Sequence, residues 1–160
     1  MTGPIRDTTG ERIQDAFVES PTRANKTAVE VYVGNAGDIS GGGSDSSLEI
    51  VNAGAILSAL KCVTVTSPNT VIYANNNIDL SSSTVFGITI VAAQLNESTQ
   101  VKTYGVLRDS SFTWPVNTQL YLDTNGSLTD TAPTTGFRTL VATSQGSGAI
   151  FINIQEPITL

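Results

Sequence analysis

Carboxylates are the side chains of this sequence that could perform acid–base chemistry, because the chain contains no histidine. The missing imidazole excludes serine–histidine and cysteine–histidine nucleophiles and removes a common transition-metal ligand. Seven acids occur between residues 48 and 160, mostly beside turn residues: Glu49, Asp79, Glu97, Asp109, Asp123, Asp130 and Glu156. Turn carboxylates usually accept hydrogen bonds from nearby backbone amides, and no two of these acids stand out as a glycosidase pair. We therefore expect a protein that is not an enzyme and needs no metal or cofactor, with a carboxylate-based depolymerase as the enzymatic alternative.

Two short segments resemble ligand-binding loops, but each lacks a required part. Residues 41–44 are glycine-rich like a phosphate loop, yet the Lys-Ser/Thr ending and the following helix are missing. Residues 123–126 begin like a calcium loop, yet the bidentate glutamate is missing. We interpret the first segment as a flexible linker and the second as a hairpin turn, in which Asn125 and Gly126 supply positive φ angles.

One aromatic residue is a candidate for ligand contact. Trp114 precedes Pro115 in a stretch that we expect to be a loop, and an aromatic face can stack on a sugar ring. Trp114 and the nearby Asn117 would then form a glycan contact for attachment to a host surface. The sequence favours a different role for Trp114, as an apolar plug at one end of a β-barrel.

The elements that would position these side chains are short β-strands. Runs of β-branched and aromatic residues bounded by Gly, Asn, Ser or Pro predict strands at 63–66, 70–73, 88–91, 119–122, 139–142 and 150–154. Such a series is typical of an all-β fold, and we expect a β-sandwich or barrel-like domain over residues 48–160. Two helical exceptions are expected: a short helix at 52–60 and one helical turn at 79–85 that is capped by Asp79.

The apolar positions of these strands predict the core. The single cysteine, Cys62, cannot form an internal disulfide and is expected to be buried as a small hydrophobic residue. The other expected core residues are Val63, Val65, Ile72, Ile88, Ile90, Val101, Leu120, Leu122, Leu140, Ile150, Ile152 and Ile154. A chain of 160 residues is long enough to bury such a core in one domain and to carry an additional arm.

Residues 1–47 differ from the rest in charge, and we interpret them as an extended attachment arm that ends in a Gly/Ser-rich linker. Nine of the first thirty residues are charged, four of them basic and five acidic. Residues 28–33 alternate like a strand that could join a partner's sheet. A disordered tail is the alternative, but the apolar content of residues 13–18 favours docking. The residues predicted to bind the partner are Ile13, Phe17, Val18, Val29, Val31 and Val33.

Charge and composition limit the partners of the chain. The formal net charge is −6 without a basic stripe, so nucleic-acid binding is not expected. No run approaches the roughly 18 apolar residues that span a membrane, and residues 1–7 lack the apolar stretch of a signal peptide. Charged residues make up only 14%, which suits faces covered by identical subunits or, alternatively, a stable extracellular β-domain. We expect a homo-oligomer, most simply a homotrimer.

About a hundred residues also resemble a known family in the order of their motifs. The motifs are AGAI at 53–56, VFGIT at 85–89, VAA at 91–93, QVK at 100–102, YGV at 104–106, WPV at 114–116, LYLD at 120–123, GSLT at 126–129, GFR at 136–138 and FINIQEPITL at 151–160. They are similar to the small β-domain of bacteriophage capsid decoration (cement) proteins and of head-, neck- and tail-fibre proteins. The resemblance implies a structural protein of the virion, made in the host bacterial cytoplasm, whose partners are itself and capsid, neck, tail or baseplate proteins. Stabilisation of the shell as a cement protein and attachment to a host glycan are the alternatives.

Overall fold

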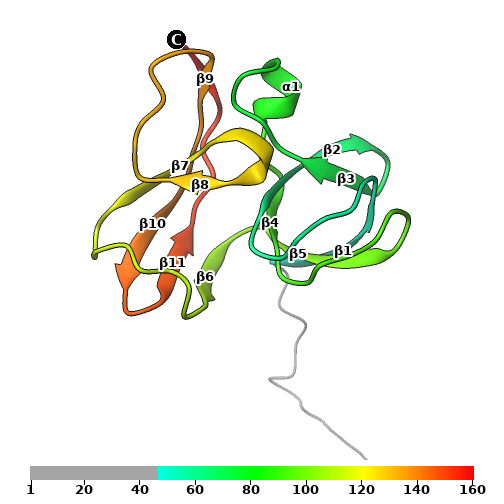
Figure 1. The fold of residues 1–160 in the computed structure, drawn as a ribbon, viewed down its shortest axis with the longest axis horizontal. Helices are drawn as coiled ribbons and strands as arrows, with labels where there is room; N and C mark the ends of the chain where they lie inside the picture. Colours follow the sequence, from blue (N-terminus) through cyan, green and yellow to red (C-terminus); the bar gives the residue numbers. More distant parts are fainter. Residues whose placement is uncertain (1–46) are drawn as a thin grey trace, which may run out of the picture. The chain divides into compact units, whose positions relative to one another are not determined.

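The computed structural model describes residues 47–160, and nearly all regular elements in this range are β-strands (Figure 1). The first five are β1 (Leu48–Ala53), β2 (Cys62–Ser67), β3 (Thr70–Tyr73), β4 (Gly87–Thr89) and β5 (Ser98–Lys102). These strands close into a small barrel in the order β1-β3-β2-β4-β5. Closure depends on β1, which pairs in parallel with β3 and antiparallel with β5, so that Asn52 lies opposite both Thr70 and Ser98.

The strands that follow the barrel form an open sheet and a two-stranded ribbon. They are β6 (Gly105–Arg108), β7 (Gln119–Leu122), β8 (Leu128–Thr129), β9 (Phe137–Arg138), β10 (Leu140–Gly146), β11 (Ala149–Ile152) and β12 (Ile158–Thr159). The open sheet is antiparallel in the order β6-β11-β10-β7-β8, and β9 pairs with β12. Figure 1 shows the barrel at right and the open sheet at left. The prediction of an all-β fold is confirmed.

The expected helical turn is present as α1 (Leu80–Ser83). Its N-cap is Asp79, whose Oδ1 accepts hydrogen bonds from the Ser82 backbone N–H and the Ser81 hydroxyl, both at 2.8 Å. The bond from Ser82 satisfies one of the backbone donors that the first turn of a helix leaves without partners. The Thr139 hydroxyl donates to the Ser83 carbonyl at 2.9 Å, which joins α1 to the segment between β9 and β10.

The helix predicted at 52–60 is wrong. Strand β1 continues to Ala53, and the segment after it forms turns, with Leu60 at a φ of 62°. Leu57 exchanges two backbone hydrogen bonds with Ala93, at 2.8 and 2.9 Å, and its side chain is buried inside the barrel. Burial of Leu57 in the barrel therefore outweighs the weak helical propensity of the segment.

The hairpin predicted at residues 123–126 is confirmed. It connects β7 to β8, where Leu122 lies opposite Leu128. Asn125 and Gly126 have φ values of 52° and 70°, as an Asn-Gly turn allows. The Asp123 backbone N–H donates to the Ser127 carbonyl at 2.8 Å and closes the loop.

Two hydrophobic clusters fill the described part of the chain. The barrel core is the smaller cluster and consists of Val51, Ala53, Leu57, Val63, Val71, Ala93 and Val101. The central cluster is larger and contains residues of both sheets: Cys62, Ala74, Val85, Ile88, Leu107, Phe112, Leu120, Leu122, Val141, Ala142, Ile150 and Ile152. Strand β2 contributes to both, since Val63 belongs to the barrel core and its neighbour Cys62 belongs to the central cluster.

Most of the predicted core is confirmed. Eight of the predicted residues are buried: Cys62, Val63, Ile88, Val101, Leu120, Leu122, Ile150 and Ile152. Four others are only partly buried: Ile72, Ile90, Leu140 and Ile154. The prediction for Val65 is wrong, because its side chain is 47% exposed. Within β2, only Cys62 and Val63 pair with β4, so the far end of β2 has β3 alone beside it and Val65 lies uncovered.

The predicted attachment arm lies outside the described residues, apart from Ser47 at its end. This holds for the strand near 28–33 and for all six predicted partner-binding residues, so these stay predictions. Within residues 47–160, no helix combines the length and the apolar character that crossing a membrane requires.

Candidate functional site

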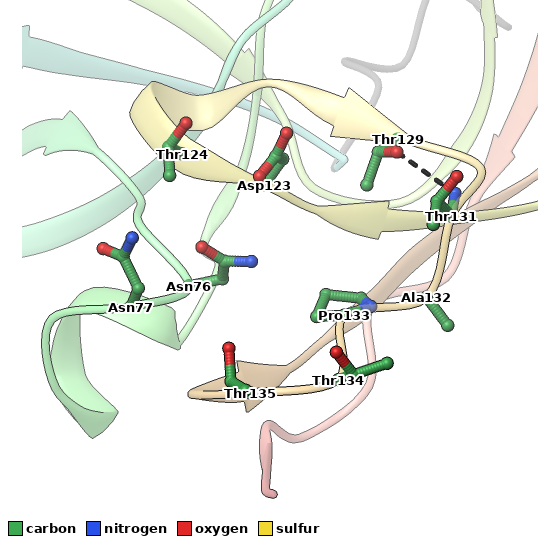
Figure 2. Close-up of a pocket in the computed structure, with 10 residues that line it drawn as sticks. All are labelled: Asn76, Asn77, Asp123, Thr124, Thr129, Thr131, Ala132, Pro133, Thr134 and Thr135. Carbon is green, nitrogen blue, oxygen red and sulfur yellow. Dashed lines mark hydrogen bonds between the residues drawn. The ribbon is translucent and has the colours of Figure 1, made fainter.

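A polar hollow lies where the barrel, the β7–β8 hairpin and the β8–β9 loop meet (Figure 2). Its volume is about 390 Å³. Amide, hydroxyl and carboxylate side chains dominate its wall, which is formed by Asn76, Asn77, Asp123, Thr124, Thr129, Thr131, Ala132, Pro133, Thr134 and Thr135. We call this region the Asn76 hollow.

Asn76 and Asn77 follow β3, the second strand of the β2–β3 hairpin of the barrel. The chain is held there by the buried Ala74, whose N–H donates to the Cys62 carbonyl at 3.0 Å. The Asn76 carbonyl in turn accepts the backbone N–H of Phe137 in β9 at 2.9 Å. A side chain on Gly136 would meet that carbonyl at 2.6 Å, so glycine permits this close approach. The backbone of Asn76 is therefore fixed from two sides.

The second wall comes from the β7–β8 hairpin, which carries Asp123 and Thr124. The hairpin is tied to the barrel by the Gly126 N–H, which donates to the Ala74 carbonyl at 2.8 Å. The Lys61 ammonium group adds a second tie at 3.0 Å from the Ser127 hydroxyl. Both bonds connect elements far apart in sequence, and together they set the position of Asp123 relative to Asn76.

The third wall is the threonine-rich loop between β8 and β9. The Thr129 hydroxyl accepts the backbone N–H of Thr131 at 3.1 Å, which tightens the start of the loop (Figure 2). Pro133 limits the backbone further by fixing its own φ. The loop thus presents several hydroxyl groups, together with the methyl groups of its threonines and Ala132.

Asn76 differs from the other lining residues because it has a buried side-chain oxygen that is not hydrogen-bonded to any described residue. Its side chain is only 7% exposed, and its Oδ1 atom is buried without a hydrogen-bond partner among residues 47–160. Figure 2 shows the amide pointing toward the segment that holds Asp123 and Thr124. A buried polar atom without a partner costs free energy, about 1–3 kcal/mol, and such atoms are rare in native proteins. An Asn at this position therefore suggests a partner from outside residues 47–160.

The side chains of the hollow carry one negative charge and no positive charge. Asp123 is the single charged residue in its wall. With no cation among the lining residues, an anionic ligand has nothing to pair with. Within residues 47–160, no group of three or more Asp, Glu, Cys or His side chains could hold a metal ion. The wall offers mainly hydroxyl and amide groups for hydrogen bonds.

The carboxylates elsewhere behave as the turn interpretation predicts. Hydrogen bonds from the Ser82 backbone and the Ser81 hydroxyl lower the pKa of Asp79 below its usual value of 3.8. Hydrogen bonds from the hydroxyl and backbone N–H of Ser111 lower the pKa of Asp109 in the same way. Asp79 is exposed and Asp109 is partly buried, and each acid stabilises its own turn. Burial raises the pKa of the Cys62 thiol to about 12, which makes it inert as a nucleophile at neutral pH.

Trp114 and Asn117, the predicted glycan contacts, lie away from the Asn76 hollow. Trp114 is partly buried, packs against the central cluster and stacks on Phe112 with a centroid distance of 5.9 Å. It does not plug the barrel, whose interior is filled by other residues, so the plug interpretation is wrong. Asn117 is exposed in a separate hollow of about 380 Å³, lined also by Val116, Gln145 and Phe151.

The residues of the Asn76 hollow were not predicted as a site. They come from three separate segments, and Asn, Thr and Asp are the usual residues of turns. The available signals were compositional: three consecutive asparagines at 75–77 and a threonine-rich stretch at 129–135. Neither pattern differs from an ordinary loop until the fold brings the segments together. A search with protein-family models and a search of curated proteins both found no match to this chain.

Proposed function

We propose that the protein is a non-enzymatic structural component of a bacteriophage virion, a fibre or decoration protein of the head, neck or tail. Residues 1–47 would attach it to another virion protein, and the β-domain would contact further copies of the same chain. The resemblance of the motifs between residues 53 and 160 supports the virion assignment. A cement protein that stabilises the capsid shell is a variant of the same proposal.

The observation that supports self-association best is an apolar strip on the outside of the barrel. Ile50 of β1 is 66% exposed and Val91, after β4, is 48% exposed. They line a shallow hollow of about 300 Å³ together with Ser98, Thr99 and Gln100 of β5. Its lining residues carry no charge, so two or three identical copies can meet there without repulsion between like charges.

This surface can be tested with matched variants of two exposed isoleucines. We expect the full chain to sediment as a homo-oligomer, most simply a trimer, and Ile50→Asp to sediment as a monomer because a charge would be buried in the contact. Ile158→Asp is the control and should sediment like wild type, since Ile158 is 55% exposed on β12 and does not line the strip. A wild-type chain that stays monomeric at high concentration, or an Ile50→Asp variant that assembles like wild type, would contradict the assignment.

Attachment by the arm requires a separate experiment on particles. Residues 46–160 form one compact unit, so we expect a chain without residues 1–33 to fold. If the arm binds a virion protein, the truncated chain should be missing from purified particles of the parent phage. Incorporation at the normal copy number would show that the arm does not anchor the protein.

A further inference from the structure

We propose that the Asn76 hollow is a binding site for a neutral carbohydrate. No motif of the sequence marks this site, and its lining residues are different from those of the apolar strip of the barrel. The inference is therefore independent of the proposed structural function. It rests on one buried acceptor, on the composition of the wall and on the shape of the hollow.

The buried acceptor is Asn76 Oδ1. The Asn76 backbone is already occupied by the bond with Phe137, whereas its side-chain oxygen has no partner within the described chain. The residue is 93% buried and lies in the wall of the hollow, and Oδ1 itself has almost no accessible surface, so the side-chain amide must turn to present this oxygen to the hollow. A ligand hydroxyl that enters the hollow can donate to this oxygen and remove the cost of leaving it unpaired.

The rest of the wall suits the other hydroxyl groups of a sugar. Threonine hydroxyls both donate and accept hydrogen bonds, as sugar hydroxyls do, and the Asn77 amide can do both. Figure 2 shows Thr135 on the opposite side of the hollow from the hairpin that carries Thr124. Pro133, Ala132 and the threonine methyl groups provide apolar contacts for the C–H face of a sugar ring.

Other ligand classes fit the hollow less well. Phosphate, sulfate or a carboxylate would lie beside Asp123 with no cation to pair with. Calcium takes six to eight oxygen ligands at short distances, and its tight sites use several carboxylates, whereas this wall offers one. An extended peptide would need a long free strand edge, but β8 beside the hollow has only two residues.

The size of the hollow also favours a sugar over an ion. A volume of about 390 Å³ lies in the range of small-molecule sites, which is about 300–1,000 Å³. A single ion would leave most of the hydrogen-bonding groups of the wall without contact. A mono- or disaccharide reaches all three segments at once.

The test is a titration of the full, ¹⁵N-labelled chain with neutral sugars, followed by nuclear magnetic resonance. The probes are the methyl glycosides of glucose, galactose and mannose and their common disaccharides. We expect shifts of the Asn76 side-chain amide and of the backbone amides at 76–77 and 129–135 with at least one probe. Calcium chloride alone is titrated in parallel.

Four variants separate the alternatives. Asn76→Ala should weaken sugar binding at least tenfold, and Thr135→Val should weaken it severalfold. The melting temperature of Asn76→Ala should stay at or above that of wild type. Asp123→Asn removes the single carboxylate of the wall, so a shift that depends on a bound calcium ion should be lost in this variant. Asn153→Ala, at an exposed position outside the hollow, should bind like wild type.

Three results would overturn the proposal. The first is no shift at these positions with any sugar probe. The second is unchanged sugar affinity in both Asn76→Ala and Thr135→Val. The third is a shift with calcium chloride that disappears in Asp123→Asn, which would make the hollow an ion site. None of these outcomes affects the sedimentation test of the barrel strip, so the two proposals fail separately.

Discussion

The barrel and the open sheet each contain five strands, but they achieve stability differently. The barrel pairs β1 with both β3 and β5, so its sheet has no free edge. Its interior is small and filled with Val, Ala and one Leu. The open sheet leaves β6 and β8 as edges, and it buries its larger apolar residues in the central cluster.

The central cluster makes the open sheet dependent on the barrel. Cys62, Ala74, Val85 and Ile88 come from the barrel and its connections, and they cover the residues that β7, β10 and β11 contribute. Without them, one face of the open sheet would be exposed to water. A closed sheet leaves no strand edge with unpaired backbone groups, whereas an open sheet needs a neighbouring element to cover its apolar face. We therefore expect both parts to unfold together.

The largest expected effect is a loss of stability that is greater for a substitution in the central cluster than for one in the barrel core. Leu120→Ala should lower the free energy of unfolding by about 2–5 kcal/mol, because Leu120 is fully buried in the central cluster. Val101→Ala in the barrel core should lower it by about 2 kcal/mol, since fewer methyl groups are removed. Urea titrations followed by circular dichroism measure both values.

The same titrations test whether the two parts unfold as one. The single tryptophan, Trp114, packs on the central cluster and reports on it by fluorescence, whereas circular dichroism reports on all strands. We expect coincident transitions in both variants. If Trp114 fluorescence changes before the circular dichroism signal in Leu120→Ala, the barrel is stable alone and the dependence described above is wrong.

The next largest effect concerns the contact between the hairpin and the barrel. A Cβ atom on Gly126 would collide with the backbone carbonyl of Cys62, and the residue has a φ of +70°. Gly126→Ala should therefore cost about 2–4 kcal/mol, from a strained backbone and a forced separation of the two parts. Gly105→Ala is the control, since its φ is +92° but its nearest neighbour, the Lys102 side chain, is 3.9 Å away. Backbone strain alone should cost about 1–2 kcal/mol there, and equal losses in both variants would show that the collision does not matter.

The smallest expected effect is the loss of the α1 cap and its dependence on pH. The lowered pKa of Asp79 means that its carboxylate stabilises the fold above the usual pKa of 3.8 and loses this effect as the pH falls through the lowered value. Asp79→Ala should lower the melting temperature slightly at pH 7, and the difference from wild type should shrink toward zero in acid. A difference that is constant between pH 7 and pH 2 would mean that the charge of Asp79 is not involved.

The fold class could be predicted from the sequence, but its division into a barrel and an open sheet could not. Short β-branched runs look alike in both parts, and closure depends on a parallel pairing of β1 with β3 that no local pattern specifies. The segment 52–60 was predicted as a short helix because it is an apolar stretch, although Gly54 weakens that pattern. Its conformation follows from the burial of Leu57 among residues distant in sequence.

The candidate site could be predicted even less. Asp79 and the turn at Asn125 were identified because capping and turn residues act on their immediate neighbours. Asn76 becomes special only because its side chain is buried beside a loop more than fifty residues later in the chain. Trp114 was considered for glycan contact by residue type alone, but its ring is largely occupied by Phe112 and the central cluster.

The position of Cys62 has a practical consequence. Its thiol is fully buried in the cluster shared by barrel and open sheet, and burial raises its pKa to about 12. A thiol reagent at pH 8 can therefore modify it only when the two parts separate. Because it is the sole cysteine of the chain, its rate of modification reports on that separation alone. Its labelling rate, read by mass spectrometry, would record how often the domain opens under native conditions, without any engineered probe.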